Sequence, residues 1–131
     1  MSTENNQLSM KFKNTMKVII VKPFTNPYVA TIKGDLESMQ KAVGGLIEIM
    51  QIDRNVNIVL NEEGKLIGLE GNRRVGNHVI VGNFFICGEK GEDFCSLTDE
   101  QCEKYVQEFA QLHEITQDEI EEDTYIVVIT F

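Results

Sequence analysis

Short apolar runs separated by polar turns fill most of the chain, a pattern typical of β-strands. We expect strands over residues 18–21, 28–32, 46–52, 56–60, 66–69 and 78–87. Asn26-Pro27 and Asp53-Arg54-Asn55 have turn-forming composition and predict two hairpins. Gly82 predicts a bulge or a close backbone approach within the last run, and the polar segments 70–77 and 88–93 are expected to be connections.

Two stretches have helical spacing instead. Asp35 is expected to cap a short helix, whose apolar positions are Leu36, Met39 and Val43 and which ends at Gly44-Gly45. Thr98 and Gln101 form a capping box, followed at helical spacing by Cys102, Tyr105, Val106, Phe109 and His113.

The C-terminal part joins an acidic stretch, Glu114 to Asp123, to an apolar run, Tyr125 to Ile129. We expect this run to be a closing strand that is central in the sheet or paired with another chain, as in a homodimer. The whole pattern predicts an α+β fold, mostly an antiparallel sheet with two short helices. We expect residues 16–131 to form a single domain and residues 1–15 to be a mobile leader.

Composition narrows the classes of function. The net charge of −9 disfavours direct binding to nucleic acid or anionic lipid, although it leaves open an acidic surface that mimics nucleic acid. Three cysteines, at positions 87, 95 and 102, fit no disulfide framework and favour a reducing compartment. The chain has neither a bilayer-length apolar run nor a signal peptide pattern, so we expect a cytoplasmic protein with no membrane contact.

No set of residues has the spacing of a catalytic or metal centre. His78 and His113 lack the spacing that directs two ligands to one ion, and the acidic run 118–123 lacks the pattern of a calcium loop. We therefore expect no enzyme activity, no metal and no cofactor.

One polar cluster is the best candidate for a binding site. Arginine suits the recognition of carboxylate or phosphate, and polar turns project from the end of a sheet. We predict a ligand site made of Asn61, Glu62, Asn72 and Arg73, with Phe84 and Phe94 as apolar walls. The alternative is structural: Glu62 or Glu63 pairs with Arg73 or Arg74 and holds two turns together.

The sequence also resembles a family of small domains of unknown function that is common in phages, plasmids and other mobile elements of Gram-positive bacteria. The resemblance runs from about Met16 to Phe109. It rests on Lys17-Val18-Ile19-Ile20-Val21, Val43-Gly44-Gly45-Leu46-Ile47-Glu48, Asn61-Glu62-Glu63-Gly64-Lys65-Leu66 with Asn72-Arg73, Gly82-Asn83-Phe84-Phe85-Ile86, and Asp93-Phe94 through Ser96-Leu97-Thr98-Asp99-Glu100-Gln101.

This resemblance implies a setting rather than a mechanism, because a family does not fix a function. Small mobile-element proteins often act on host factors or sequester signalling molecules. Our first hypothesis is therefore a non-catalytic binding protein that sequesters a small anionic, nucleotide-like ligand. The second is an inhibitor or adaptor that binds a host protein through the acidic stretch Glu114 to Asp123.

Overall fold

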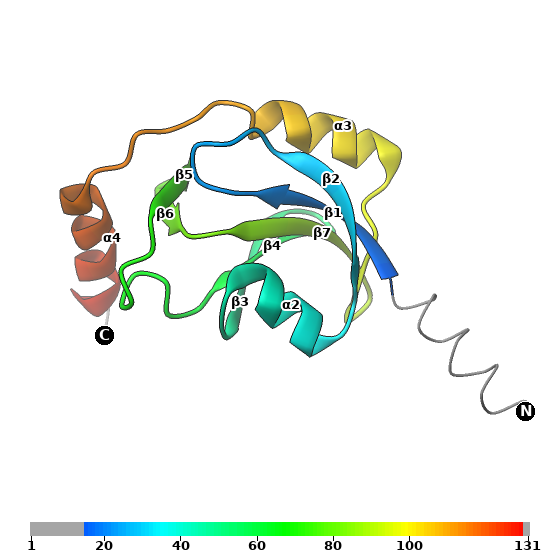
Figure 1. The fold of residues 1–131 in the computed structure, drawn as a ribbon, viewed down its shortest axis with the longest axis horizontal. Helices are drawn as coiled ribbons and strands as arrows, with labels where there is room; N and C mark the ends of the chain where they lie inside the picture. The colour runs from blue at the N-terminus through cyan, green and yellow to red at the C-terminus, as the bar shows by residue number, and fades with distance from the viewer. Residues whose placement is uncertain (1–14, 130–131) are drawn as a thin grey trace, which may run out of the picture.

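A six-stranded antiparallel sheet lies between helices in an α+β fold (Figure 1). The computed structural model describes residues 15–129, with side chains as far as residue 123. The strand order is β2-β1-β7-β4-β3, with β8 paired to β7, and a separate two-stranded sheet contains β5 and β6. The strands are β1 (Thr15–Val21), β2 (Tyr28–Lys33), β3 (Ile47–Asp53), β4 (Val56–Asn61), β5 (Gly71–Val75), β6 (His78–Val81), β7 (Phe84–Lys90) and β8 (Asp93–Cys95). The helices are α2 (Leu36–Val43), α3 (Asp99–Glu108) and α4 (Gln117–Ile129).

The central sheet carries a separate apolar cluster on each face, and β7 shows why. Phe84 and Ile86 point to the face that α3 covers, whereas Phe85 and Cys87 point to the face that α2 covers. Successive side chains of a strand alternate between faces, so a strand buried on both faces must be apolar throughout. Each fully buried phenylalanine or isoleucine side chain contributes roughly 1.5–3 kcal/mol to the free energy of folding.

The expected caps of the first two helices are confirmed. Asp35 accepts a hydrogen bond from the Ser38 amide at 2.7 Å, and Gly44 ends α2 at a φ of 80°. The capping box before α3 is complete, because Thr98 Oγ1 accepts from the Gln101 amide at 3.1 Å and Gln101 Oε1 accepts from the Thr98 amide at 2.8 Å.

The hairpins formed by β1 with β2 and by β3 with β4 are also confirmed. Residues 1–14 of the expected leader lie outside the described residues, and Thr15 begins β1. None of the helices in residues 15–129 has the length and apolar composition needed to cross a bilayer.

The region from residue 62 to residue 95 differs from the prediction. Residues 66–69 form turns rather than a strand, whereas the expected connection 70–77 contains β5. The expected single strand 78–87 is two strands of different sheets, because Gly82 has a φ of 74° and its amide donates to Glu70 O at 2.7 Å. The expected loop 88–93 instead contains the end of β7 and its turn into β8.

The expected closing strand Tyr125 to Ile129 is wrong, because these residues belong to α4, the third helix. Thr116 Oγ1 accepts from the Glu119 amide at 3.2 Å, and Ile120 packs against Val79 and Val81 of β6. Once this first turn is capped and docked, each further residue adds a hydrogen bond, so the helix continues into the apolar run. A homodimer through a C-terminal strand loses its structural basis.

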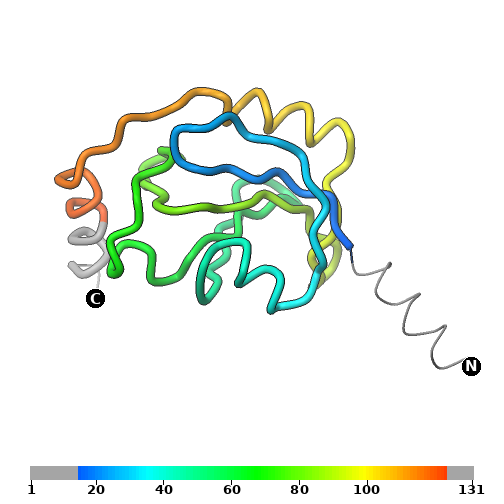
Figure 2. Tube along the Cα trace, in the orientation of Figure 1, coloured from blue at the N-terminus to red at the C-terminus, as the bar shows by residue number. Residues whose placement is uncertain are grey.

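The expected apolar stripe of α3 is one turn shorter than predicted. The helix ends at Glu108 and Phe109 caps it, so His113 lies in the connection to α4. Figure 2 shows this connection passing from α3 to α4 at the end of the molecule that holds β5 and β6.

Candidate functional site

The six predicted site residues lie in three places rather than around one cavity. Asn72, Arg73 and Phe84 are buried in the interior. Asn61 and Glu62 lie at the end of β4 and line one groove, while Phe94 in β8 lines a different hollow.

Arg73 is a buried cation surrounded by uncharged acceptors. Its side chain is 1% exposed, and Nε donates to Phe109 O at 3.0 Å. Nη1 donates to the Asn72 side-chain oxygen at 2.7 Å and to Asn72 O at 3.2 Å, and Nη2 donates to Thr25 O at 2.7 Å. Burial lowers the pKa of Arg73. The arginine therefore connects β5 to the β1–β2 loop and to the end of α3.

Asn72 completes this junction. Its Nδ2 donates to Val21 O at 3.0 Å and to Gly82 O at 2.8 Å. Val21 ends β1 and Gly82 separates β6 from β7, so both carbonyls lie where regular strand pairing stops. A buried carbonyl without a donor costs about 1–3 kcal/mol, so Asn72 stabilises the place where β5 and β6 meet the central sheet.

Asn61 has a similar structural role in another place. Its Nδ2 donates to Val43 O at 3.2 Å, and its Oδ1 accepts from the Glu63 amide at 2.8 Å. A Cβ atom on Gly45 would lie only 2.8 Å from Asn61 Nδ2. Asn61 therefore joins the end of α2 to the turn after β4, and leaves Glu62 exposed at the surface.

A groove beside β3 is the hollow that Asn61 and Glu62 line. It has a volume of about 460 Å³ and lies between the β3–β4 hairpin and β6. Its apolar lining includes Met50, Leu60, Val79 and Val81, and its ionisable lining consists of Glu48, Glu62, Lys65, His78 and Asp123. We call this hollow the β3 groove.

The charges around the β3 groove leave a negative excess. Lys65 forms an ion pair with Asp123, whose Oδ1 lies 3.4 Å from His78 Nδ1. Burial alone would raise the pKa of Asp123, but hydrogen bonds from Lys65 and the Val79 amide lower it below the usual value. Among the described residues, Glu48 and Glu62 have no ion-pair partner.

The outer edge of β3 is free within the part of the chain that the structure describes. β3 ends the strand order, and the Glu62 amide donates to Leu46 O at 2.8 Å. In an antiparallel ladder, hydrogen-bonded and non-hydrogen-bonded pairs alternate. The register Ile47↔Asn61 and Ile49↔Val59 therefore directs the backbone N–H and C=O groups of Ile47 and Ile49 away from β4.

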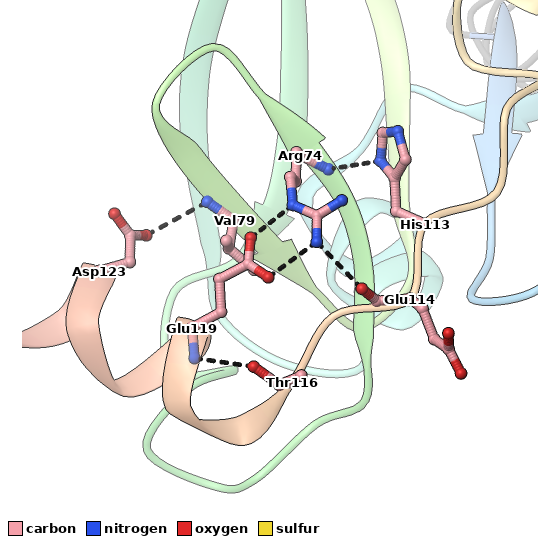
Figure 3. A network of polar contacts seen from close by, with 7 residues as sticks. All are labelled: Arg74, Val79, His113, Glu114, Thr116, Glu119 and Asp123. Carbon is pink, nitrogen blue, oxygen red and sulfur yellow. Dashed lines mark hydrogen bonds and ion pairs between the residues drawn. The ribbon is translucent and has the colours of Figure 1, made fainter.

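The acidic stretch 114–123 partly serves to hold α4 in place (Figure 3). Glu119 accepts from Arg74 Nε at 2.5 Å and from Nη2 at 2.8 Å, and the same Nη2 donates to Glu114 O at 3.0 Å. The Arg74 amide donates to His113 Nδ1 at 3.0 Å, which requires a neutral imidazole. The predicted structural ion pair between Glu62 or Glu63 and one of the two arginines is therefore wrong. Arg74 pairs with Glu119 instead.

The buried cysteines and the possible metal ligands do not form a reactive centre among the residues with described side chains. Burial raises the pKa of Cys87 to about 12 and also raises that of Cys102, so both thiols are poor nucleophiles at neutral pH. No group of three or more metal-ligating side chains occurs among residues with described side chains.

Comparison with known proteins gives one family assignment. A family model described as a domain of unknown function, DUF3846, matches residues 16–110. Neither the curated proteins nor the solved structures include a significant match to the chain. The matched range runs from the second residue of β1 to just beyond the end of α3, and it ends before α4.

Proposed function

The chain belongs to the DUF3846 family, and we propose that it is a non-catalytic binding protein whose β3 groove holds a basic, apolar segment of another protein. The observation that supports this proposal most is one hollow that combines an apolar lining with the carboxylates of Glu48 and Glu62. Within the part of the chain that the structure describes, neither carboxylate has an ion-pair partner and β3 beside them is the outermost strand. The resemblance to mobile-element proteins favours a host factor as the source of this segment.

The charge of the groove supports a basic ligand. Lys65, the cationic side chain that lines the groove, is already paired with Asp123, whereas Glu48 and Glu62 are exposed and available. The net charge of −9 for the whole chain adds a long-range attraction for a basic partner and speeds its encounter with the protein.

A small anionic ligand at the originally predicted residues has less support. Arg73 would have to give up its hydrogen bonds to Phe109, Asn72 and Thr25 before it could bind a phosphate or carboxylate. Asn72 is equally occupied by two backbone carbonyls. The groove that contains Asn61 and Glu62 favours cations over anions.

The test uses a fluorescent heptapeptide that alternates lysine with valine, and a matched heptapeptide that alternates glutamate with valine. We expect fluorescence anisotropy to show binding of the basic peptide, with an affinity that falls as salt is added. The double variant Glu48→Lys, Glu62→Lys should weaken binding roughly tenfold, since two exposed pairs at about 0.2–1 kcal/mol each are lost and repulsion of similar size replaces them.

The control is the double variant Glu103→Lys, Glu108→Lys on the exposed side of α3, which changes the net charge equally but lies outside the groove. We expect it to retain most of the affinity. Equal weakening by both double variants would mean that only net charge matters, and would refute the groove as the site. Failure of the basic peptide to bind the unaltered protein would refute the proposed ligand class.

A further inference from the structure

β3 presents backbone hydrogen-bonding groups as well as the side chains that line the β3 groove. We propose that the partner segment binds as an extended strand that pairs with β3 and adds a seventh strand to the central sheet. This inference rests on the proposed function and specifies how the partner is held.

The backbone of β3 is the first step of the argument. Ile47 and Ile49 direct their N–H and C=O groups away from β4, and neither residue has another hydrogen-bond partner among the described residues. An unpaired row of this kind is a template for another strand. The added strand would therefore bind through main-chain hydrogen bonds, independently of its sequence.

The second step is that β3 has only part of the usual protection of an edge, namely the charges of Glu48 and Asp53. Residues 47–53 contain neither proline nor lysine, and Ile49 is 50% exposed. The register shift between Gln51 and Asp53 disturbs only the far end of the strand. The start of β3 is regular and places one carboxylate between two isoleucines, so an extended partner that supplies a cation opposite Glu48 fits this edge.

The side chains then specify the partner's chemistry. Glu48 lies opposite Leu60 and, by strand alternation, on the same face as Met50, which lines the β3 groove. By the same alternation Ile47 and Ile49 lie on the other face, where Ile47 packs against the cluster beneath α2, while Ile49 also contributes to the lining of the β3 groove. A strand placed beside β3 would therefore set alternate side chains next to Glu48 and the remainder next to isoleucines, which favours alternating basic and aliphatic residues.

The opposite edge of the sheet does not offer the same site. β2 ends the strand order on that side, and it carries Lys33. The Lys22 ammonium lies 5.8 Å from the ring centre of Tyr28 in the same strand. A basic segment is therefore directed to β3 rather than to β2.

The experiment compares three forms of the alternating lysine–valine heptapeptide: unmodified, N-methylated at the valines, and N-methylated at the lysines. Only alternate residues of an added strand donate to its neighbour, so methylation of one set should abolish main-chain pairing. We expect one methylated peptide to lose at least tenfold in affinity and the other to bind nearly as well as the unmodified peptide. Equal binding by all three would refute strand addition while leaving the groove as the binding site.

A second measurement changes the protein instead of the peptide. Ile49→Pro removes an outward N–H without removing a bond to β4, a position where an edge strand tolerates proline. Ile49→Ala is the matched variant, because it removes the side chain and keeps the N–H. We expect at least tenfold weaker binding for Ile49→Pro than for Ile49→Ala, both measured with the unmodified peptide.

The outcomes separate the two proposals. Similar affinities for Ile49→Pro and Ile49→Ala would overturn strand addition. Self-association of the unaltered protein that Ile49→Pro abolishes would also overturn it, because the occupant of the β3 edge would then be a second copy. If Ile49→Pro fails to fold, the methylated peptides decide the question with the unaltered protein. No binding of any peptide refutes the proposed function itself.

Discussion

Arg73 offers the sharpest test of how this fold is held together. We consider Arg73→Met, which keeps the length and apolar stem of the side chain and removes all of its donors. The change strips hydrogen bonds from Phe109 O, Thr25 O and both the backbone and side-chain oxygens of Asn72, and removes one of the few buried charges.

The expected magnitude follows from two opposing effects. Each of the four oxygens loses a donor in a buried or partly buried place, at about 1–3 kcal/mol apiece. Against this, the folded state no longer has to desolvate a guanidinium, which offsets several kcal/mol of that loss. We expect a net destabilisation of about 3 kcal/mol, a large fraction of the roughly 5–15 kcal/mol that is usual for a domain.

Urea denaturation followed by circular dichroism measures this loss as a lower midpoint at an unchanged slope. Because the acceptors of Arg73 are uncharged, the loss should be the same at low and high salt. Arg73→Lys is the matched control, because it keeps the charge but cannot reach all the acceptors. Its stability should lie between those of the unaltered protein and Arg73→Met. A loss below about 1 kcal/mol for Arg73→Met would refute the structural role and make Arg73 available for a ligand.

Two further predictions concern His113, in the connection before α4, and Gly82, between β6 and β7. Burial lowers the pKa of His113 below 6.5, and the nearby Arg74 lowers it further, so the stability that neutral His113 provides is full above pH 6.5 and is lost as pH falls through the lowered pKa. Thermal melts from pH 8 to pH 5 should show this loss, and His113→Gln, whose side-chain oxygen can still accept, should reduce the slope. Gly82→Ala should destabilise by about 2–3 kcal/mol in urea, because it combines a φ of 74° with a Cβ 2.6 Å from Leu69 Cδ1.

Each of these predictions has a clear contrary result. An unchanged slope with pH in His113→Gln would mean that other groups control the acid response. Gly76→Ala is the control for Gly82→Ala, since Gly76 has a φ of 59° but open space around it. Equal losses at the two glycines would mean that the contact with Leu69 contributes nothing and that only the backbone conformation matters.

Local signals in the sequence were sufficient for the elements that form through near neighbours. The cap at Asp35 and the capping box at Thr98 act over three residues, so both helix starts are readable without tertiary information. The same is true of the two hairpins, whose turn residues lie between neighbouring apolar runs. The apolar runs of β4 and β7 follow from burial on both faces of the sheet.

The errors occur where distant residues supply the partners. Asn72 and Arg73 looked like an exposed polar turn, because their acceptors lie up to 51 residues away in the chain. Arg74 and Glu119 are 45 residues apart, so their pairing gave no local signal. The β3 groove likewise depends on β6 and α4 lying beside a hairpin that precedes them, which only the packed chain reveals.

Local patterns in the sequence are sufficient for the α+β class, the hairpins and the first two helices. They are also sufficient for the family resemblance, which the family model over residues 16–110 confirms. Only the packed chain reveals that Tyr125 to Ile129 continue a helix, that Arg73 faces inward and that β3 is the outermost strand of the sheet among residues 15–129. The physical reason is the range of the forces involved. Capping and alternation act between near neighbours, whereas the burial of a charge and the exposure of a strand edge depend on which distant segments pack together.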